Sequence, residues 1–254
     1  MISVPSGSFL MGSDHHYPEE RPAHSEHVRA FAISRAPVSV AEFAAFVDAT
    51  GYVTSAERQP TDFDAPAGSA VFTPPDYPVD LGDASQWWGW VAGACWRRPT
   101  GTSDAQPDHP VVQVSHADAL TFCDWSRTRL PTEAEWERAA QGATGGNVWA
   151  GAFPYAAAGL ATTSPIGSYP PSPLGLQDAV GNVWEWTATA WAHDHAPRCC
   201  EPVTDPLAPD VALQVAKGGS FLCSEDYCAR YRPQARLAMA VDSAACHLGF
   251  RTAR

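Results

Sequence analysis

With 254 residues, 45% of them hydrophobic and 17% charged, the chain can bury a large core and does not fit the intrinsically disordered class. Its net charge of −12 argues against general binding to nucleic acids or to anionic membranes, although it would suit a basic peptide. The chain starts with no signal-peptide pattern, and no apolar run approaches the roughly 18 residues of a membrane span, so we expect a cytoplasmic protein. The chain has 7 cysteines, an odd number that does not form a complete set of disulfide pairs, and this suits a reducing compartment.

The sequence predicts short strands followed by three short helices. Strand patterns occupy residues 9–12 and 27–33. Each helix begins with capping-box spacing, in which a side chain and a backbone amide at the helix start satisfy each other. The helices also carry apolar stripes, so they are expected to pack on a core. The expected N-caps and their partners are Ser39 with Glu42, Ser115 with Asp118, and Thr132 with Glu135.

Residues 55–110 are rich in Pro and Gly and show little periodicity, which predicts a long loop. A loop of this length inside a compact domain is usually functional. It carries Trp87, Trp88, Trp90 and Trp96, and aromatic side chains on an irregular surface are typical of a peptide cleft. The alternative is that these rings pin the loop to the core.

The stretch from Lys217 to Arg232 holds Cys223 and Cys228, which are five residues apart. On a helix the two side chains would point about 140° apart, and on a strand they would lie on opposite faces. The thiols can therefore meet only if the chain bends between them, and the polar run 224–226 suits such a bend. We interpret the stretch as a strand that leads, through a glycine pair, into a loop carrying a dithiol.

The spacing alone is compatible with a structural disulfide or with two unrelated core cysteines. Two thiolates close together would instead make a soft site, suited to Cu(I) or zinc. Zinc normally takes four ligands, and no His or Cys at zinc spacing flanks the pair, so a two-coordinate Cu(I) site fits better. We assign no role to the vicinal pair Cys199-Cys200 or to Cys95.

Six blocks of sequence, running nearly end to end, resemble the formylglycine-generating enzyme (sulfatase-modifying factor) family. Most of them mark the broad superfamily, whereas the Cys223/Cys228 pair is more specific because many members with other roles lack it. The resemblance implies one α+β domain over residues 1–254 with a C-type-lectin-like, loop-rich fold, and we expect a monomer. The blocks are residues 7–13, 108–111, 129–137, 181–186, 217–232 and 247–251.

The resemblance also implies a chemistry. Family members are copper-dependent oxidases that use O2 to convert a peptidyl cysteine, in a Cys-x-Pro-x-Arg-type motif of an unfolded sulfatase, to formylglycine. Cys223 and Cys228 match the Cu(I) ligands, and the open site would accept the substrate cysteine as a third thiolate. Ser220 matches the family's active-site serine. Tyr227 can likewise hydrogen-bond substrate or oxygen, and Trp184 would wall the oxygen pocket.

Two further kinds of site follow from the resemblance. Relatives carry a Trp-rich segment that contributes to the substrate groove, which points to Trp87 and Trp88 here. Calcium is expected on carboxylate and carbonyl oxygens, the ligands that a hard cation prefers. A first site would need an Asp after Asn147 that residues 149–177 lack, so we expect it to be empty or weak. The second and better match comprises Asp178, Gly181, Val183 and Glu185.

The chain departs from the family beside the dithiol, where residues 224–226 (Ser-Glu-Asp) replace a common His-Arg-Ser run. Carboxylates close to the thiols would raise their pKa values and could alter substrate choice. Pro233 and Thr252 stand where secreted members have cysteines, so those disulfides are not expected.

Two rival classes stay open. One is a non-catalytic peptide-binding paralogue, against which the cysteine pair argues. The other is a superfamily tailoring oxidase acting on a non-sulfatase substrate, such as an iron-dependent enzyme that forms C–S bonds. The iron enzymes use a separate His-bearing domain, for which there is no room before Gly7.

Overall fold

The computed structural model describes residues 1–61, 63–196, 203–206 and 208–254, so the Cys199-Cys200 pair lies outside the described residues. Within these ranges, no helix has the length and apolar character needed to cross a membrane. The helices are α1 (Val40–Thr50), α2 (His116–Ser126) and α3 (Glu133–Ala140), with short 3-10 turns η1 (Pro18–Glu20), η2 (Ser55–Glu57) and η3 (Ala84–Gln86). The strands are β1 (Ile2–Val4), β2 (Gly7–Met11), β3 (His24–Val28), β4 (Phe31–Ile33), β5 (Gly68–Phe72), β6 (Trp88–Ala92), β7 (Gly151–Ala152), β8 (Ala156–Ala157), β9 (Trp184–Ala190), β10 (Thr204–Asp205), β11 (Ala208–Lys217), β12 (Arg236–Ala240) and β13 (Leu248–Phe250).

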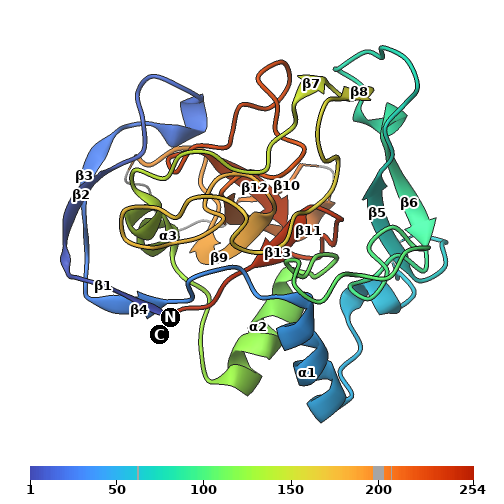
Figure 1. Ribbon diagram of the computed structural model, residues 1–254, viewed down its shortest axis with the longest axis horizontal. Coiled ribbons are helices and arrows are strands. Elements are labelled where there is room, and N and C mark those ends of the chain that lie inside the picture. Colours follow the sequence, from blue (N-terminus) through green and yellow to red (C-terminus); the bar gives the residue numbers. More distant parts are fainter. Residues whose placement is uncertain (62, 197–202, 207) are drawn as a thin grey trace.

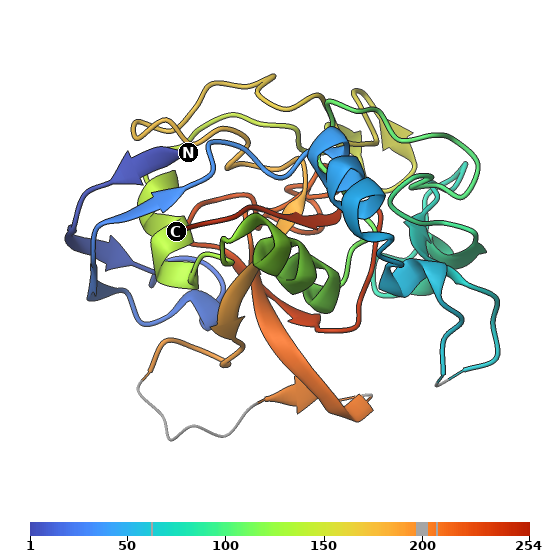
Figure 2. The same cartoon turned by 90° about the horizontal axis from the view of Figure 1, so that it is seen from below.

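A five-stranded sheet occupies the centre of the molecule (Figure 1). In it β11 pairs antiparallel with β9, β10 and β12, and β13 runs parallel to β9. Small two-stranded pairs surround this sheet: β1 with β4, β2 with β3, β5 with β6, and β7 with β8. The two termini lie side by side, because Ala253 near the end bridges to Ile33 in β4 (Figures 1 and 2). The expected α+β, loop-rich fold is confirmed.

All three predicted helices are present, and each begins one residue after its expected cap. Ser39, Ser115 and Thr132 each accept a hydrogen bond from the backbone N–H three residues later, and the carboxylate of the acidic residue there accepts the backbone N–H of the cap. The apolar faces of α1 and α2 meet, with the rings of Phe43 and Phe122 stacked at 5.8 Å. Figure 2 shows these two helices close together, beneath the sheet in the view of Figure 1.

The strands were predicted less well than the helices. The strand expected over residues 27–33 is divided into β3 and β4, because its two halves pair with different partners, β2 and β1. Residues 55–110 contain the antiparallel pair β5 and β6, although a loop was expected throughout. β5 is buried at four of its five positions, so it lacks the apolar/polar alternation by which a half-exposed strand is recognised.

A buried charge network joins α3 to the central sheet. Lys217, the last residue of β11, is fully buried and donates to the carboxylates of Glu133 (3.4 Å) and Glu137 (2.9 Å). Arg236 at the start of β12 donates to Glu133 at 2.9 Å, and the backbone amide of Gly12 donates to Glu137 at 2.8 Å. Four separate segments therefore meet at the point where the chain leaves β11 for the cysteine loop.

Replacing Glu133 by glutamine is expected to destabilise the fold by about 3–5 kcal/mol, because Lys217 and Arg236 would remain buried without their shared counter-charge. Burial raises the pKa of Glu133, but the charges of Lys217, His195 and Arg236 outweigh it and hold the pKa at about 2, below its ordinary value of 4.5. The stabilisation by this carboxylate is therefore complete above pH 4.5 and is lost as the pH falls through about 2.

Urea unfolding of the parent and of Glu133→Gln across pH 3–8 checks this prediction. The matched control is Asp48→Asn, which removes an exposed ion pair with Arg97 (3.8 Å) and should change stability by less than about 1 kcal/mol. An equal loss of unfolding free energy in Glu133→Gln and Asp48→Asn would contradict the assignment. So would a stability difference between the parent and Glu133→Gln that widens as the pH falls below 4.5.

Candidate active site

The dithiol lies in the loop that follows β11. Gly218 and Gly219 adopt φ values of 97° and 75°, and a Cβ atom on Gly219 would lie 2.8 Å from the carbonyl oxygen of Arg230. The glycine pair thus lets the two arms of the loop approach each other closely. The Sγ atoms of Cys223 and Cys228 are 3.6 Å apart and both thiols are free, since a disulfide bond would need about 2.05 Å.

The expected bend between the cysteines is a turn built on Ser224. Its carbonyl oxygen accepts the backbone N–H groups of Cys228 (2.8 Å) and Tyr227 (3.3 Å), and its Oγ accepts the N–H of Asp226 (3.2 Å). The polar run therefore folds the chain back in the way the sequence predicted. Cys223 is buried, with 1% exposure, whereas Cys228 is only partly buried, so the pair has a closed and an open member.

The two thiols differ in acidity. Burial raises the pKa of Cys223 well above its ordinary value. The pKa of Cys228 falls to about 6, first because Cys223 hydrogen-bonds to its sulfur and further because Arg230 interacts with it, both against the effect of burial. Glu225, expected to raise the thiol pKa values, instead accepts a hydrogen bond from the Tyr231 hydroxyl at 3.4 Å. At neutral pH the site therefore offers one thiolate beside one thiol.

Arg230 is fixed by residues from the beginning of the chain. The carboxylate of Glu19 accepts from its Nε at 2.8 Å and from its Nη2 at 2.7 Å, and the guanidinium lies 3.6 Å from the ring centroid of Tyr17. The Tyr17 hydroxyl also accepts the N–H of Ala229 at 3.1 Å. Sequence patterns could not reveal this contact, because its partners lie more than 200 residues apart.

The structure gathers the other expected site residues around the dithiol. Ser220 is fully buried, and its backbone N–H donates to Cys223 Sγ at 3.4 Å. Trp184 is buried in the same hydrophobic cluster as Cys223. Tyr227 is 39% exposed, with its ring stacked on Phe153 at 4.7 Å, so its face is fixed while its edge remains accessible.

The two tryptophans expected in the substrate cleft have different roles. Trp87 is 2% exposed and lies edge-on to the rings of Tyr227 (5.5 Å) and Phe153 (5.7 Å). It therefore supports Tyr227 from within the core and is not among the residues that line the pocket beside Trp88, which is the alternative considered for the aromatic loop. Trp88 is half-buried beside the imidazole of His247, with ring centroids 4.8 Å apart.

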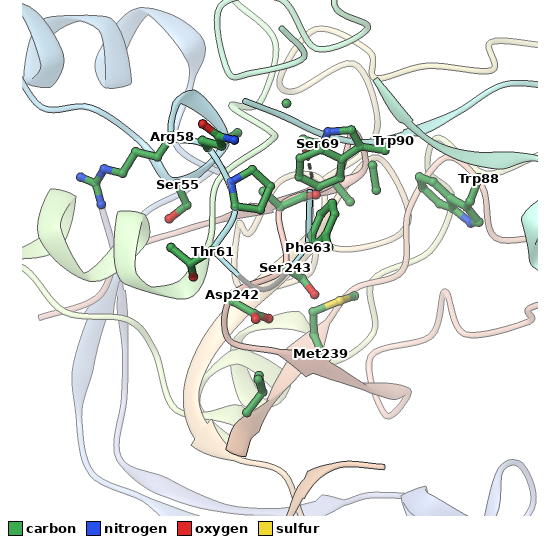
Figure 3. Close-up of a pocket in the computed structure, with 18 of the residues that line it drawn as sticks. Ser55, Arg58, Thr61, Phe63, Ser69, Trp88, Trp90, Met239, Asp242 and Ser243 are labelled. Carbon is green, nitrogen blue, oxygen red and sulfur yellow. Dashed lines mark hydrogen bonds between the residues drawn. The ribbon is translucent and has the colours of Figure 1, made fainter. Parts of the chain in front are cut away.

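Trp88 forms part of the wall of an open pocket of about 730 Å³. Trp90 lines the same pocket, 42% exposed and packed edge-on against Phe63 at 4.9 Å (Figure 3). Trp88 and Met239, which both line the pocket, pack against the hydrophobic cluster that contains Cys223 and against which Cys228 also packs. The sequence missed most of this lining because it comes from separate parts of the chain, within residues 55–70, 88–90 and 239–247 and at Val211.

His247 places an unpaired polar atom at this pocket. Its Nδ1 is buried and has no hydrogen-bond partner among the described residues. Burial lowers the pKa of His247 to about 4, so the imidazole is neutral at physiological pH. Because Nδ1 has almost no exposed surface, it is a buried, unpaired atom behind the pocket wall and not a group that the pocket presents.

The expected calcium ligands provide a partial site. Asp178 is buried; its Oδ2 accepts the N–H of Gly167 at 2.8 Å, and its Oδ1 has no partner among the described residues. Glu185 accepts two hydrogen bonds from Arg251 and one from Trp136, so about one of its four lone-pair positions is free. No group of three or more His, Cys, Asp or Glu gathers as a metal site in the described ranges, so calcium would depend on Asp178 together with backbone carbonyls.

A loop-rich α+β domain that holds two free thiols together on one loop, and that carries an open aromatic pocket, defines a class of thiol-bearing scaffold. Residues 1–254 match the model of the family described as "Sulfatase-modifying factor enzyme 1-like domain". The chain belongs to this family, as the sequence blocks had indicated.

Three relatives bear on function. The "Formylglycine-generating enzyme" of Mycobacterium tuberculosis is 47% identical, over 99% of this chain and 96% of that protein. The Bos taurus protein of the same name is 37% identical, over 100% of this chain and 74% of that protein. A Mus musculus protein named "Inactive C-alpha-formylglycine-generating enzyme 2" is 35% identical, over 100% and 85% respectively.

The fold is also similar to the solved structure of PvdO from Pseudomonas aeruginosa. The TM-score is 0.67 at 24% identity, over 99% of this chain and 92% of that one. At this identity the likeness supports the fold and carries no argument about function.

Alkylation of the metal-free protein tests the unequal thiols. Iodoacetamide is expected to label Cys228 well before Cys223, with a rate that rises through pH 6, because Cys228 is the more acidic and more exposed thiol. Cys223→Ala should slow labelling of Cys228 at pH 7 by about tenfold, since it removes the hydrogen bond that contributes most to the low pKa. Peptide mass spectrometry assigns the labelled residue. Equal labelling of both thiols, or a rate that rises only above pH 8, would contradict this account.

Proposed function

We propose that this chain converts a peptidyl cysteine of a sulfatase to formylglycine, with O2 as the oxidant and Cu(I) held by Cys223 and Cys228. The supporting observation is the pair of free thiols, 3.6 Å apart, in a chain of this family. Two thiolates select soft Cu(I) over hard cations, which fits the donor set at this loop. When bound, Cu(I) would receive the substrate thiolate and supply the redox centre for O2.

The proposed conversion is a two-electron oxidation of the substrate side chain. The CH2–SH group loses two hydrogens, and water replaces sulfur to give the aldehyde and hydrogen sulfide. O2 accepts the two electrons and two protons, forming hydrogen peroxide. The cysteines of the enzyme undergo no net change, so the pair can turn over.

The protein's own groups have distinct roles in this proposal. Cys223 and Cys228 would both hold the metal, and Cys228, already ionised at neutral pH and partly exposed, would be the thiol on the substrate side. Ser220 fixes Cys223 through its backbone N–H. Tyr227, supported by Trp87, presents its hydroxyl beside the pair, while Trp184 keeps the interior side free of water.

The open pocket of about 730 Å³ is proposed to hold the substrate peptide. Its aromatic and sulfur-bearing side chains, Trp88, Trp90, Phe63 and Met239, suit apolar parts of a peptide. The pocket packs on the same cluster as the dithiol, so a bound peptide could present its cysteine there.

Cys223→Ala and Cys228→Ala are each expected to abolish tight Cu(I) binding and aldehyde formation while leaving the fold intact. The parent should hold about one Cu(I) in competition with a strong Cu(I) chelator, and should convert a Cys-x-Pro-x-Arg peptide. Cys95→Ala is the control, because it removes a buried thiol elsewhere. A parent that folds and binds no copper would overturn the oxidase proposal in favour of a non-catalytic peptide-binding protein.

Calcium is proposed at Asp178, with carbonyl oxygens of Gly181 and Val183 and the remaining lone pair of Glu185. The supporting observation is the unpartnered buried oxygen of Asp178, whose pKa is raised by burial. An oxygen ligand set of this kind suits a hard cation.

Added calcium is expected to raise the melting temperature of the parent. A cation that binds the native state and not the unfolded state stabilises the native state by mass action. EDTA should reverse the effect, and Asp178→Ala should abolish the response. Magnesium is the control cation, since it demands a tighter octahedral geometry. An unchanged melting curve in EDTA, together with an Asp178→Ala variant that still responds to calcium, would remove the site.

A further inference from the structure

A second pocket, of about 230 Å³, adjoins the open pocket described above. The two share part of a wall, because β5 and residues 245–247 contribute to both. Ala245 and His247 line the open pocket, whereas Cys246 between them lines the second. The Phe72 N–H in β5 donates to Cys246 Sγ at 3.3 Å, which joins the two parts of this wall. A molecule in the second pocket is therefore separated from one in the open pocket.

The second pocket is polar at the protein surface and apolar inside. Its exposed lining residues are all polar: Thr100, Ser103, Asp104, Gln106 and Thr162. Its buried lining residues are Val40, Val71, Phe72, Pro110, Val112, Phe221 and Cys246. The pocket therefore extends from solvent into the core, and we refer to it as the apolar pocket.

The interior of the apolar pocket suits a small apolar molecule better than water. A buried water needs about two to four polar partners, and Cys246 is the one buried side chain with a polar atom among the described lining residues. Its sulfur already accepts the Phe72 N–H. Apolar cavities of about 150 Å³ stay dry and bind small apolar molecules such as xenon. With its volume of about 230 Å³, the pocket is smaller than the roughly 300–1,000 Å³ typical of sites for larger ligands.

Phe221 places the inner end of the apolar pocket beside the buried thiol. It is 3% exposed and comes two residues before Cys223, so the two Cα atoms are at most about 7.6 Å apart. The chain turns between them, since the Cys223 N–H donates to the Ser220 carbonyl oxygen at 3.0 Å and the Ser220 N–H donates to Cys223 Sγ at 3.4 Å. Phe221 also packs with Leu222 and Cys246 in one hydrophobic cluster. The apolar pocket thus reaches the turn that holds Cys223.

We propose that the apolar pocket binds dioxygen and admits it to the buried side of the dithiol. This role rests on the proposed function, in which O2 is the oxidant. There the substrate peptide approaches the partly exposed Cys228, so a separate entry beside Cys223 lets O2 reach the pair while the peptide is bound. Dioxygen is small and apolar, and it matches the interior of the pocket in both respects.

Oxygen binding is tested with O2 itself, because the molecule is paramagnetic and speeds the relaxation of nearby nuclei. In the copper-free parent under O2 pressure, the relaxation enhancement should be about threefold larger for the methyl groups of Val71 and Val112 than for those of Val4 and Val28, as for a small apolar molecule concentrated in an apolar cavity. Val4 and Val28 are the internal controls, because they are similarly buried but lie in another hydrophobic cluster. Equal enhancement at all four valines would overturn the proposal.

Filling the pocket tests whether the bound O2 serves the reaction. Ala105→Leu and Ala161→Leu each add an isopropyl group at a half-buried lining position. In the copper-loaded enzyme either variant is expected to lower kcat/KM for O2 by about fivefold and to leave the KM for the Cys-x-Pro-x-Arg peptide unchanged, because the peptide binds elsewhere. The matched control is Ala44→Leu, at a half-buried position on α1 outside the pocket. Variants are compared only where they keep the parent's melting temperature.

The relaxation and kinetic measurements separate this proposal from the proposed function. A larger enhancement at Val71 and Val112 in a parent that forms no aldehyde would reject the oxidase proposal alone and leave the oxygen site standing. Loss of this difference in the filled variants, together with the fall in kcat/KM for O2, supports delivery through the pocket. Loss of the difference with an unchanged kcat/KM for O2 would overturn the delivery role, because O2 would then reach the thiols from their exposed side.

Discussion

The buried ion pairs of Lys217 determine where the cysteine loop begins. An ammonium group with no exposed surface is tolerated only when counter-charges accompany it, and Glu133 and Glu137 on α3 supply them. Because Glu137 also holds the amide of Gly12, the same contact fixes the end of β2. The loop that starts at Gly218 is thereby anchored to a helix, the sheet and the N-terminal strand pair before it reaches its first thiol.

A second set of ion pairs holds the far arm of the same loop. Glu19 pairs with Arg230, and Glu20, which is fully buried, pairs with Arg232 through two hydrogen bonds of 2.7 and 2.9 Å. The cysteine loop is therefore fixed at both ends by charges, while its tip is held by the hydrogen bonds of the turn at Ser224 and by the packing of Tyr227 on Phe153 and Trp87. This arrangement keeps the two sulfur atoms close and leaves one side of the pair open.

Local signals in the sequence predicted the parts of the structure that depend on neighbours in the chain. Capping boxes located the three helices, and the need for a bend at residues 224–226 followed from the five-residue spacing of the cysteines. The two ion-pair sets escaped prediction, since Glu19 and Arg230 acquire their meaning only when distant segments meet. The same holds for the pocket: Trp87 and Trp88 are adjacent in sequence, yet one is buried under Tyr227 and the other lines the pocket beside His247.

The difference between the two thiols explains why a dithiol loop needs this much support. In a mobile loop both sulfurs would be exposed and alike in acidity, and they would be free to approach to bonding distance. Here two hydrogen bonds hold Cys223 in the core: the Ser220 N–H donates to its Sγ, and the Trp149 N–H donates to its carbonyl oxygen at 2.9 Å. Of the two thiols, only that of Cys228 remains partly exposed. A relative named formylglycine-generating enzyme (47% identical) and one named inactive (35% identical) both match this chain over 99–100% of its length, so the fold itself cannot decide the activity. In the proposed function we assign that decision to the fixed pair of unequal thiols.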